Sequence, residues 1–224
     1  MTTRRSSVQI RSRFVCRSNR GRRQIQSLSE MMIAAGCEHG HCHHDPEGRR
    51  LCRFLLGAPR EVYHFVWQSP EAPLRIYADT DFAGCQWARR STSGGCAVRG
   101  QHLLKHWSTT QKTVTLSSGE AELGGVVKAA AEGIGLQSLG QDLSLDHALQ
   151  LYADSSAAIG ICRRTGIGRV RHLAVGQLWV QERLREGQFT LYKVHGPSNP
   201  ADLLTKYHIK SSIRAHLDAS GVRA

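Results

Sequence analysis

The sequence predicts an α/β fold in which a mixed five-stranded sheet carries helices on both faces. Two observations predict it. Between residues 74 and 108, three strand-like runs follow one another with no helical pattern between them, which indicates an antiparallel meander. The whole order reads β-β-β-α-β-α-α-β-α, and crossover helices imply that the later strands pair in parallel.

The three antiparallel strands are expected at 74–84, 95–100 and 102–108. In the first, LRIYADTDFAG, apolar residues precede a carboxylate. The other two strands alternate apolar and polar residues on either side of a turn at Gly100.

A long helix is expected to open within 116–123. Ser117 and Glu120 have the spacing of a capping box, in which the glutamate carboxylate returns to the N-cap amide. Apolar residues then recur at helical spacing, at Leu123, Val126, Val127, Ala130 and Ile134. Four glycines lower the helix propensity and indicate close packing or a ragged end: Gly124, Gly125, Gly133 and Gly135.

The second half of the sheet follows this helix. A strand is expected at 148–156, a short helix at 156–164 and a longer helix at 170–187. The last strand is expected at 189–195, and 201–206 starts a final helix.

The composition excludes a wholly disordered chain, because 40% of the 224 residues are hydrophobic and 21% are charged. No apolar run approaches the roughly 18 residues of a spanning helix, so no membrane partner is expected. The net charge of +12 suits a polyanion, with nucleic acid the first candidate and an anionic membrane the second.

Residues 1–48 are predicted to form a basic, disordered extension. Eight arginines and no acidic residue precede Glu30, a pattern that also fits an organelle transit peptide or a solvated tail. The seven cysteines form no C-x-x-C pair, which favours reduced thiols in an intracellular protein, cytoplasmic or nuclear and not secreted. Six possible ligands crowd into one short stretch and form either a metal site or an adventitious one: Cys37, His39, His41, Cys42, His43 and His44.

Four carboxylates lie at positions where the predicted fold could bring their side chains close together. Asp79 and Asp154 end two strands, and Glu122 and Asp202 open two helices. Singly, an acidic residue at a helix start is explained by capping and the helix dipole. As a set they would repel one another unless cations lay between them. Hard oxygen ligands favour Mg²⁺ or Mn²⁺, and two such ions about 4 Å apart can drive phosphodiester hydrolysis.

The chain resembles the C-terminal ribonuclease H domain of copia-type retrotransposon Pol polyproteins. Six segments carry the resemblance, in the family's order: YADTDFAGC, WARRSTSGG, LLKHWSTTQKTVTLSSGEAEL, LYADSSAAIGI, VRHLAVGQLWVQE and NPADLLTK. The resemblance implies a ribonuclease H-like domain at 74–210. Before it, 49–73 resembles a remnant of the reverse-transcriptase and connection region with a linker, and 211–224 is expected to be a C-terminal tail.

The resemblance implies an enzyme that cuts the RNA strand of RNA–DNA hybrids with two Mg²⁺ ions, for which Mn²⁺ substitutes. Its partners would be the hybrid and the reverse transcriptase of the parent polyprotein. The family's four metal-binding and catalytic carboxylates fall on Asp79, Glu122, Asp154 and Asp202. His195 matches a mobile loop histidine that helps turnover, although an exposed loop imidazole explains it equally.

Five further residues are candidates for substrate binding: Arg89, Arg90, Lys105, Lys112 and Ser155. The basic side chains could contact phosphates, although a solvated charged face explains each of them singly. Asp81 is interpreted as structural. The chain departs from the family at Phe82 and Ala174, which keeps open a second hypothesis, a catalytically inactive, basic nucleic-acid-binding remnant. A junction resolvase would share such acidic sites, but its strand motifs should differ.

Overall fold

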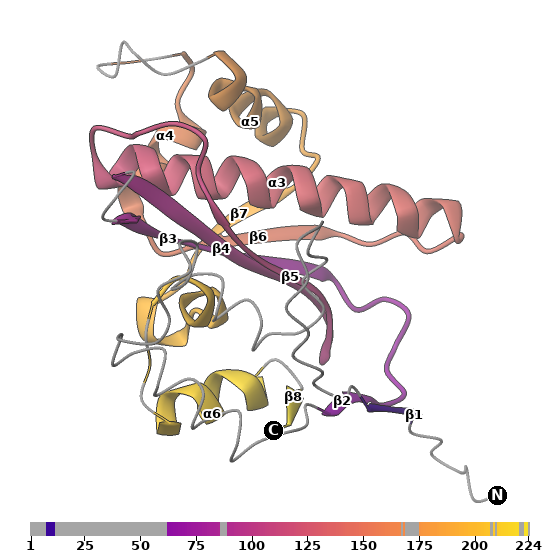
Figure 1. The fold of residues 1–224 in the computed structure, drawn as a ribbon. Coiled ribbons are helices and arrows are strands. Elements are labelled where there is room, and N and C mark those ends of the chain that lie inside the picture. The colour runs from indigo at the N-terminus through magenta and orange to yellow at the C-terminus, as the bar shows by residue number, and fades with distance from the viewer. Residues whose placement is uncertain are drawn as a thin grey trace, which may run out of the picture.

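The computed structural model describes residues 8–11, 62–85, 89–166, 168, 175–206, 208, 210–219 and 222–223. The main sheet has five strands in the order β5-β4-β3-β6-β7 (Figure 1). Its strands are β3 (Leu74–Cys85), β4 (Arg90–Arg99), β5 (His102–Thr110), β6 (Leu149–Ala153) and β7 (Thr190–Lys193).

The pairing of the strands confirms the predicted mixed sheet. β3 pairs antiparallel with β4, and β4 pairs antiparallel with β5. β3 pairs in parallel with β6, and β6 pairs in parallel with β7, so the crossovers have the expected consequence. β3 therefore lies at the centre of the sheet, with the antiparallel and parallel halves on either side of it.

Helices cover both faces of this sheet, as predicted. α3 (Ser118–Asp142) packs along β3 with α4 (Ser156–Arg163) and α5 (Val175–Arg185) beside it. Two short 3₁₀ helices, η1 (Gly196–Ser198) and η2 (Pro200–Leu204), follow β7, and η2 packs against β3 and β4. The last helix, α6 (Lys210–Ala219), lies across the sheet from α3 (Figure 1).

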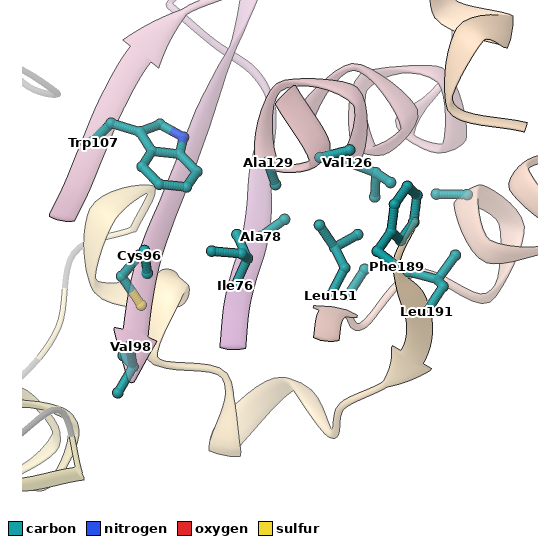
Figure 2. Close-up of a cluster of buried hydrophobic side chains, with 14 of the residues drawn as sticks. Ile76, Ala78, Cys96, Val98, Trp107, Val126, Ala129, Leu151, Phe189 and Leu191 are labelled. Carbon is teal, nitrogen blue, oxygen red and sulfur yellow. The ribbon is translucent and has the colours of Figure 1, made fainter. Parts of the chain in front are cut away.

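The hydrophobic core has one part between the sheet and α3 and another on the opposite face of the sheet, where Leu204, Ile213 and Leu217 are buried. Ile76, Ala78 and Leu151 project from the central strands towards Val126 and Ala129 of the helix (Figure 2). The helical pattern read from the sequence thus gives the buried face of α3, because residues spaced three and four apart share one side of a helix.

Two glycines allow secondary elements to approach the central strands closely. A Cβ on Gly125 of α3 would lie 2.4 Å from Thr80 Oγ1, so this glycine lets the helix contact β3 next to Asp79. A Cβ on Gly94 of β4 would lie 2.6 Å from Thr205 Cγ2 and 2.8 Å from Leu204 Cβ. Gly94 therefore lets the chain at the end of η2 lie directly on the sheet.

The structure corrects the predicted final helix. Residues 200–204 form the 3₁₀ helix η2, and the α-helix begins only at Lys210. The amide of Asp202 donates to the carbonyl of Asn199, and the amide of Thr205 donates to the carbonyl of Asp202, both i→i+3 bonds of the 3₁₀ type. The carbonyl of Asp202 also accepts an i→i+4 bond from the amide of Lys206. The predicted C-terminal tail contains α6, whose Ile213 and Leu217 are buried in the core, so that segment packs as part of the domain.

A separate three-stranded sheet pairs β1 (Val8–Arg11), β2 (Val62–Phe65) and β8 (Val222–Arg223). β1 falls inside the predicted basic extension at 1–48, and its alternating pattern suits a strand. The disorder of that extension stays a prediction. The rest of 1–48, including the Cys/His stretch at 37–44, lies outside the described residues. Among the described helices, none has the length and apolar character needed to cross a bilayer.

We expect Gly94→Ala to destabilise the protein by about 1–3 kcal/mol, because the added methyl group overlaps Leu204 and Thr205 in a packed region. Urea denaturation would measure the loss. Gly135→Ala is the matched control, since nothing lies within 4 Å of a Cβ there, and it should stabilise α3 by roughly 0.5–1 kcal/mol. Equal effects of the two substitutions would contradict the close approach at Gly94.

Candidate active site

Asp79, Glu122 and Asp154 converge at one end of the sheet. Their carboxylate oxygens, one from each residue, all lie within 4.8 Å of one another. The parallel register explains two of them, because Ala78 of β3 pairs with Ala153 of β6 and the next residue of each strand is an aspartate. Glu122 comes from the first turns of α3, which Gly125 holds against β3.

Asp79 is the buried centre of this group, with only 1% of its surface exposed. The Thr205 hydroxyl donates a hydrogen bond to Asp79 Oδ2, and Lys206 Nζ lies 3.5 Å from the same oxygen. The other oxygen, Oδ1, is buried and has no hydrogen-bond partner among the described residues. One side of the carboxylate is therefore held by the protein, and the other is left for a ligand.

The group carries more negative charge than the protein compensates. Burial raises the pKa of Asp79, against the opposing effects of Thr205 and Lys206. Burial, together with the charges of Asp79 and Asp154, raises the pKa of Glu122 to about 8. A carboxyl group with such a pKa is mostly protonated at neutral pH, which is the expected response of a buried carboxylate beside other carboxylates.

The residues present fit a hard divalent cation. The donor set consists of carboxylate oxygens alone, and an unpartnered buried oxygen of Asp79 is among them. Mg²⁺ and Mn²⁺ prefer such oxygen ligands, whereas zinc sites usually include nitrogen or sulfur. The same cation would remove the repulsion that raises the pKa of Glu122.

Asp202, the fourth predicted carboxylate, is not brought into this group. It lies in η2, where Lys206 donates to Oδ1 and His208 Nε2 lies 3.3 Å from Oδ2. Burial would raise the pKa of Asp202, but the hydrogen bonds from His208 and Lys206 outweigh it and lower the pKa. Asp202 is still near enough for its charge to contribute to the raised pKa of Asp79 and of Glu122.

Glu120 and Glu122 have different surroundings, although they are only two residues apart. Glu120 is buried, and its carboxylate accepts hydrogen bonds from the Ser117 hydroxyl and from the backbone amide of Leu116. The Ser117 side chain accepts from the Glu120 amide, as a capping box predicts. The return bond goes to the amide of Leu116, however, and not to the N-cap amide that the spacing suggested. Glu122, by contrast, faces Asp79 and Asp154.

Sequence comparison places the chain among known proteins. It is 30% identical over 158 residues to the retrovirus-related Pol polyprotein from transposon TNT 1-94 of Nicotiana tabacum. It is 29% identical over 161 residues to those from transposons RE2 and RE1 of Arabidopsis thaliana. These three relatives are Pol polyproteins from transposons. The matches cover 70% of the chain, which spans 12% and 11% of the length of these relatives, and the family resemblance read from the sequence is thereby confirmed.

No protein-family model matches the chain. Among solved structures, it is similar to the N-terminal RNase H domain of rv2228c from Mycobacterium tuberculosis, at 17% identity and a TM-score of 0.40. That match covers 67% of this chain and 99% of that one. LC11-RNase H1, isolated from compost, has 16% identity and a TM-score of 0.42, over 59% of this chain and 92% of that one. The predicted mixed sheet, with three antiparallel strands followed by parallel strands, is present here.

The loop after β7 lies beside the carboxylates of this Pol-related domain. His195 is exposed and precedes η1, and a Cβ on Gly196 would lie 3.4 Å from Asp154 Oδ2. Ser155, a predicted substrate-binding residue, caps α4, because its hydroxyl accepts from the amide of Ala158. Its side chain thus has a structural partner already.

The predicted basic residues have unequal surroundings. Arg89, Arg90 and Lys112 are exposed; the two arginines lie at the start of β4, and the lysine follows the end of β5. Lys105 is paired with Glu132 of α3 at 2.5 Å, so its charge is partly compensated within the protein. Asp81, interpreted as structural, lies against Gly84, where a Cβ would approach Asp81 Oδ2 to 1.9 Å.

Three residues of this region were not singled out from the sequence. Asn199 is fully buried, and its side chain donates to the carbonyl of Ala78 while it caps η2. Thr205 and Lys206 contact the Asp79 carboxylate. All three lie within or beside the quoted segment NPADLLTK, but nothing local in it indicates contacts with β3, more than 100 residues away. Ala174, a departure from the family, lies outside the described residues.

We expect Mg²⁺ or Mn²⁺ to raise the melting temperature, because a cation that binds only the folded state stabilises it. Asp79→Asn should abolish this rise, since it removes the charge of the buried central ligand. Differential scanning fluorimetry with and without the metal would measure both. Asp142→Asn, an exposed aspartate at the end of α3, is the matched control and should keep the full rise. An equal metal effect in Asp79→Asn would remove Asp79 from the site.

Lys206→Gln should lower the melting temperature in metal-free buffer, because Asp79 and Asp202 both lose their cationic neighbour. The same substitution should tighten Mg²⁺ binding, since the competing positive charge is gone. A Mg²⁺ titration followed by thermal melting would test both effects. Lys112→Gln provides the comparison, as Lys112 is exposed, and weaker Mg²⁺ binding in Lys206→Gln would contradict the prediction.

Proposed function

We propose that this chain is the ribonuclease H domain of a retrotransposon Pol polyprotein, and that it hydrolyses the RNA strand of RNA–DNA hybrids during reverse transcription. The observation that carries the proposal is the convergence of Asp79, Glu122 and Asp154 at one end of the sheet. The relationship to Pol polyproteins supports the same activity and supports a reverse-transcriptase domain as its partner.

The carboxylates Asp79, Glu122 and Asp154 would hold Mg²⁺, and Mn²⁺ could substitute. Asp202 would join them by analogy with the family, from its position in η2. When bound, two such ions supply an activated water and stabilise the leaving oxygen of an in-line displacement. The protein's own contribution is to keep Asp79 in place. Thr205 and Lys206 contact Oδ2, and Oδ1 therefore stays available to a metal ion.

The substrate would approach along the exposed basic residues. Arg89, Arg90 and Lys112 could contact the phosphate backbone, which supplies affinity without reading the sequence. Lys105 would contribute less, because Glu132 already pairs with it. Selection for a hybrid would come from its shape and from 2′-hydroxyls on the RNA strand. One solved ribonuclease H similar to this chain, LC11-RNase H1, is described in complex with an RNA/DNA hybrid.

His195 would assist turnover from the loop beside Asp154. Its exposed imidazole lies next to Gly196, which approaches Asp154 closely. From this position the side chain could contact the products as they leave.

Cleavage of an end-labelled RNA–DNA hybrid with Mg²⁺ tests the proposed function. RNA and DNA duplexes of the same sequence serve as controls and should remain uncut. Activity should appear with Mg²⁺ or Mn²⁺ and fail with Ca²⁺, whose looser coordination misplaces the attacking water. Robust cutting in EDTA would exclude the metal-dependent reaction.

Glu122→Gln should lower hybrid cleavage by orders of magnitude, because it removes a ligand charge from the carboxylate group. Glu120→Gln is the matched control two residues away. Glu120→Gln should lower the free energy of unfolding by at most about 1 kcal/mol, the usual scale for a helix cap, and should leave the cleavage rate largely unchanged. Single-turnover kinetics and melting curves of both variants would decide it. An active Glu122→Gln beside an inactive Glu120→Gln would reverse the two roles.

The alternative function is a catalytically inactive nucleic-acid-binding remnant, which the departures from the family at Phe82 and Ala174 keep open and for which the net charge of +12 would supply the binding. Asp154→Asn separates the two functions. If the domain is an enzyme, this substitution should abolish cleavage and preserve hybrid affinity, which the basic residues supply. If the unsubstituted chain binds the hybrid tightly but does not cut it with Mg²⁺ or Mn²⁺, the remnant is the correct description.

A further inference from the structure

A second group of possible metal ligands lies next to the carboxylates but has a different chemistry. Asp202, His208 and His216 each offer one ligand atom, and these atoms all lie within 4.8 Å of one another. The three residues come from η2, from the segment between η2 and α6, and from α6 itself. The chain turns back on itself here, so that residues 14 positions apart meet.

The group is sheltered from solvent. His216 is only 7% exposed, and the side chains of His208 and Asp202 are 11% and 15% exposed. Ile213 and Leu217, on either side of His216 along α6, are both buried in the core. The two imidazoles meet edge to face, with ring centroids 5.5 Å apart. Sheltering of this kind reduces the competition of water for a bound ion and keeps the ligands in place.

The orientation of His208 is set by its neighbours. Its Nδ1 lies 3.1 Å from Ser212 Oγ, and its Nε2 points to Asp202, at 3.1 Å from the backbone oxygen and 3.3 Å from Oδ2. Because the oxygens of Asp202 can only accept, Nε2 carries a hydrogen in this arrangement, and Nδ1 can accept from the Ser212 hydroxyl. A metal ion at Nε2 would take the place of that hydrogen, and Nδ1–H would then donate to the Ser212 oxygen. Such a partner on the second ring nitrogen is the usual support of a metal-binding histidine.

Two imidazoles and one carboxylate select a different ion from three carboxylates. Zn²⁺ and Co²⁺ bind readily to imidazole nitrogen, whereas Mg²⁺ and Ca²⁺ prefer oxygen. Three protein ligands leave a position for water in a four-coordinate site. The two neighbouring groups should therefore sort ions by chemistry, with Mg²⁺ at Asp79, Glu122 and Asp154.

We propose that Asp202, His208 and His216 bind a zinc ion. The bound ion would link η2 to α6, and it would take Asp202 Oδ2, which now faces His208. The zinc ion would then hold the Asp202 carboxylate beside the two imidazoles, and Asp202 would not share a metal ion with Asp79, Glu122 and Asp154. Zinc would stabilise the C-terminal part of the domain and would compete with any role of Asp202 in hydrolysis.

The test is a Co²⁺ titration followed by visible absorption, because Co²⁺ substitutes for zinc and its ligand-field bands report nitrogen ligands in a four- or five-coordinate site. It uses the full-length chain in excess Mg²⁺, which occupies the carboxylate group. The stretch at 37–44 could bind Co²⁺ as well, so its six candidate ligands are first replaced by serine or glutamine, at Cys37, His39, His41, Cys42, His43 and His44.

In this background we expect one equivalent of Co²⁺ to give an absorption band that Zn²⁺ removes. His208→Gln and His216→Gln should each lower the affinity for Co²⁺, measured from the growth of the band during the titration, at least tenfold. His208→Gln keeps the test informative if His216→Gln, at a more buried position, fails to fold. His195→Gln, an exposed histidine before η1, is the matched control and should leave the band unchanged.

Glu122→Gln distinguishes this proposal from the proposed function. It should abolish the Mg²⁺ effect on melting and leave the Co²⁺ band intact, because Glu122 belongs only to the carboxylate group. A band of the same intensity and affinity in His208→Gln would overturn the zinc site, whatever the outcome of the cleavage assays. Absence of any Zn²⁺-sensitive band in the starting background would overturn it equally.

Discussion

The burial of the Asp79 carboxylate is the constraint on which the site depends. A charge that is 1% exposed is costly unless the protein or a ligand compensates it. Here the compensation comes from Thr205 and Lys206, which lie at the end of η2 and reach only one of the two oxygens. The raised pKa of Asp79 indicates that this compensation is incomplete. A cation at the remaining oxygen would complete it.

Contacts from the sheet, from α3 and from η2 together bury Asp79. Parallel pairing of β3 with β6 sets Asp79 beside Asp154, and Gly125 brings the first turns of α3 close enough for Glu122 to join them. On the other side, Gly94 removes the side chain that would keep η2 away from β4. Asn199 then ties η2 to the backbone of β3 through the carbonyl of Ala78. Stability and site geometry therefore rest on the same contacts.

Asp202 connects the carboxylate group to the imidazole group. Lys206 holds one of its oxygens and His208 faces the other, so its charge is already shared between two cationic or polar partners. Its lowered pKa contrasts with the raised pKa of Glu122, although the two residues lie in the same region. Burial raises the pKa of both carboxyl groups, but hydrogen bonds from His208 and Lys206 outweigh it at Asp202, whereas the charges of Asp79 and Asp154 add to it at Glu122. Two adjoining sets of ligands with opposite electrostatic character can therefore coexist at one end of the sheet.

The sequence by itself determined the order of strands and helices, the Ser117 cap of α3 and the placement of Asp154 directly after β6, because these follow from local periodicity and spacing. The structure corrects the position of Asp79, which lies inside β3 and not at its end, because β4 continues to pair with β3 as far as Cys85. The tertiary structure decided which carboxylates meet. Glu122 joins Asp79 and Asp154, whereas Asp202 is drawn to His208 and His216. It also decided the roles of Asn199 and Thr205, whose partners in β3 are 121 and 126 residues away. Such contacts depend on how η2 packs on the sheet. The absence of a side chain at Gly94 allows this close packing, and a single glycine produces no periodic pattern in the sequence.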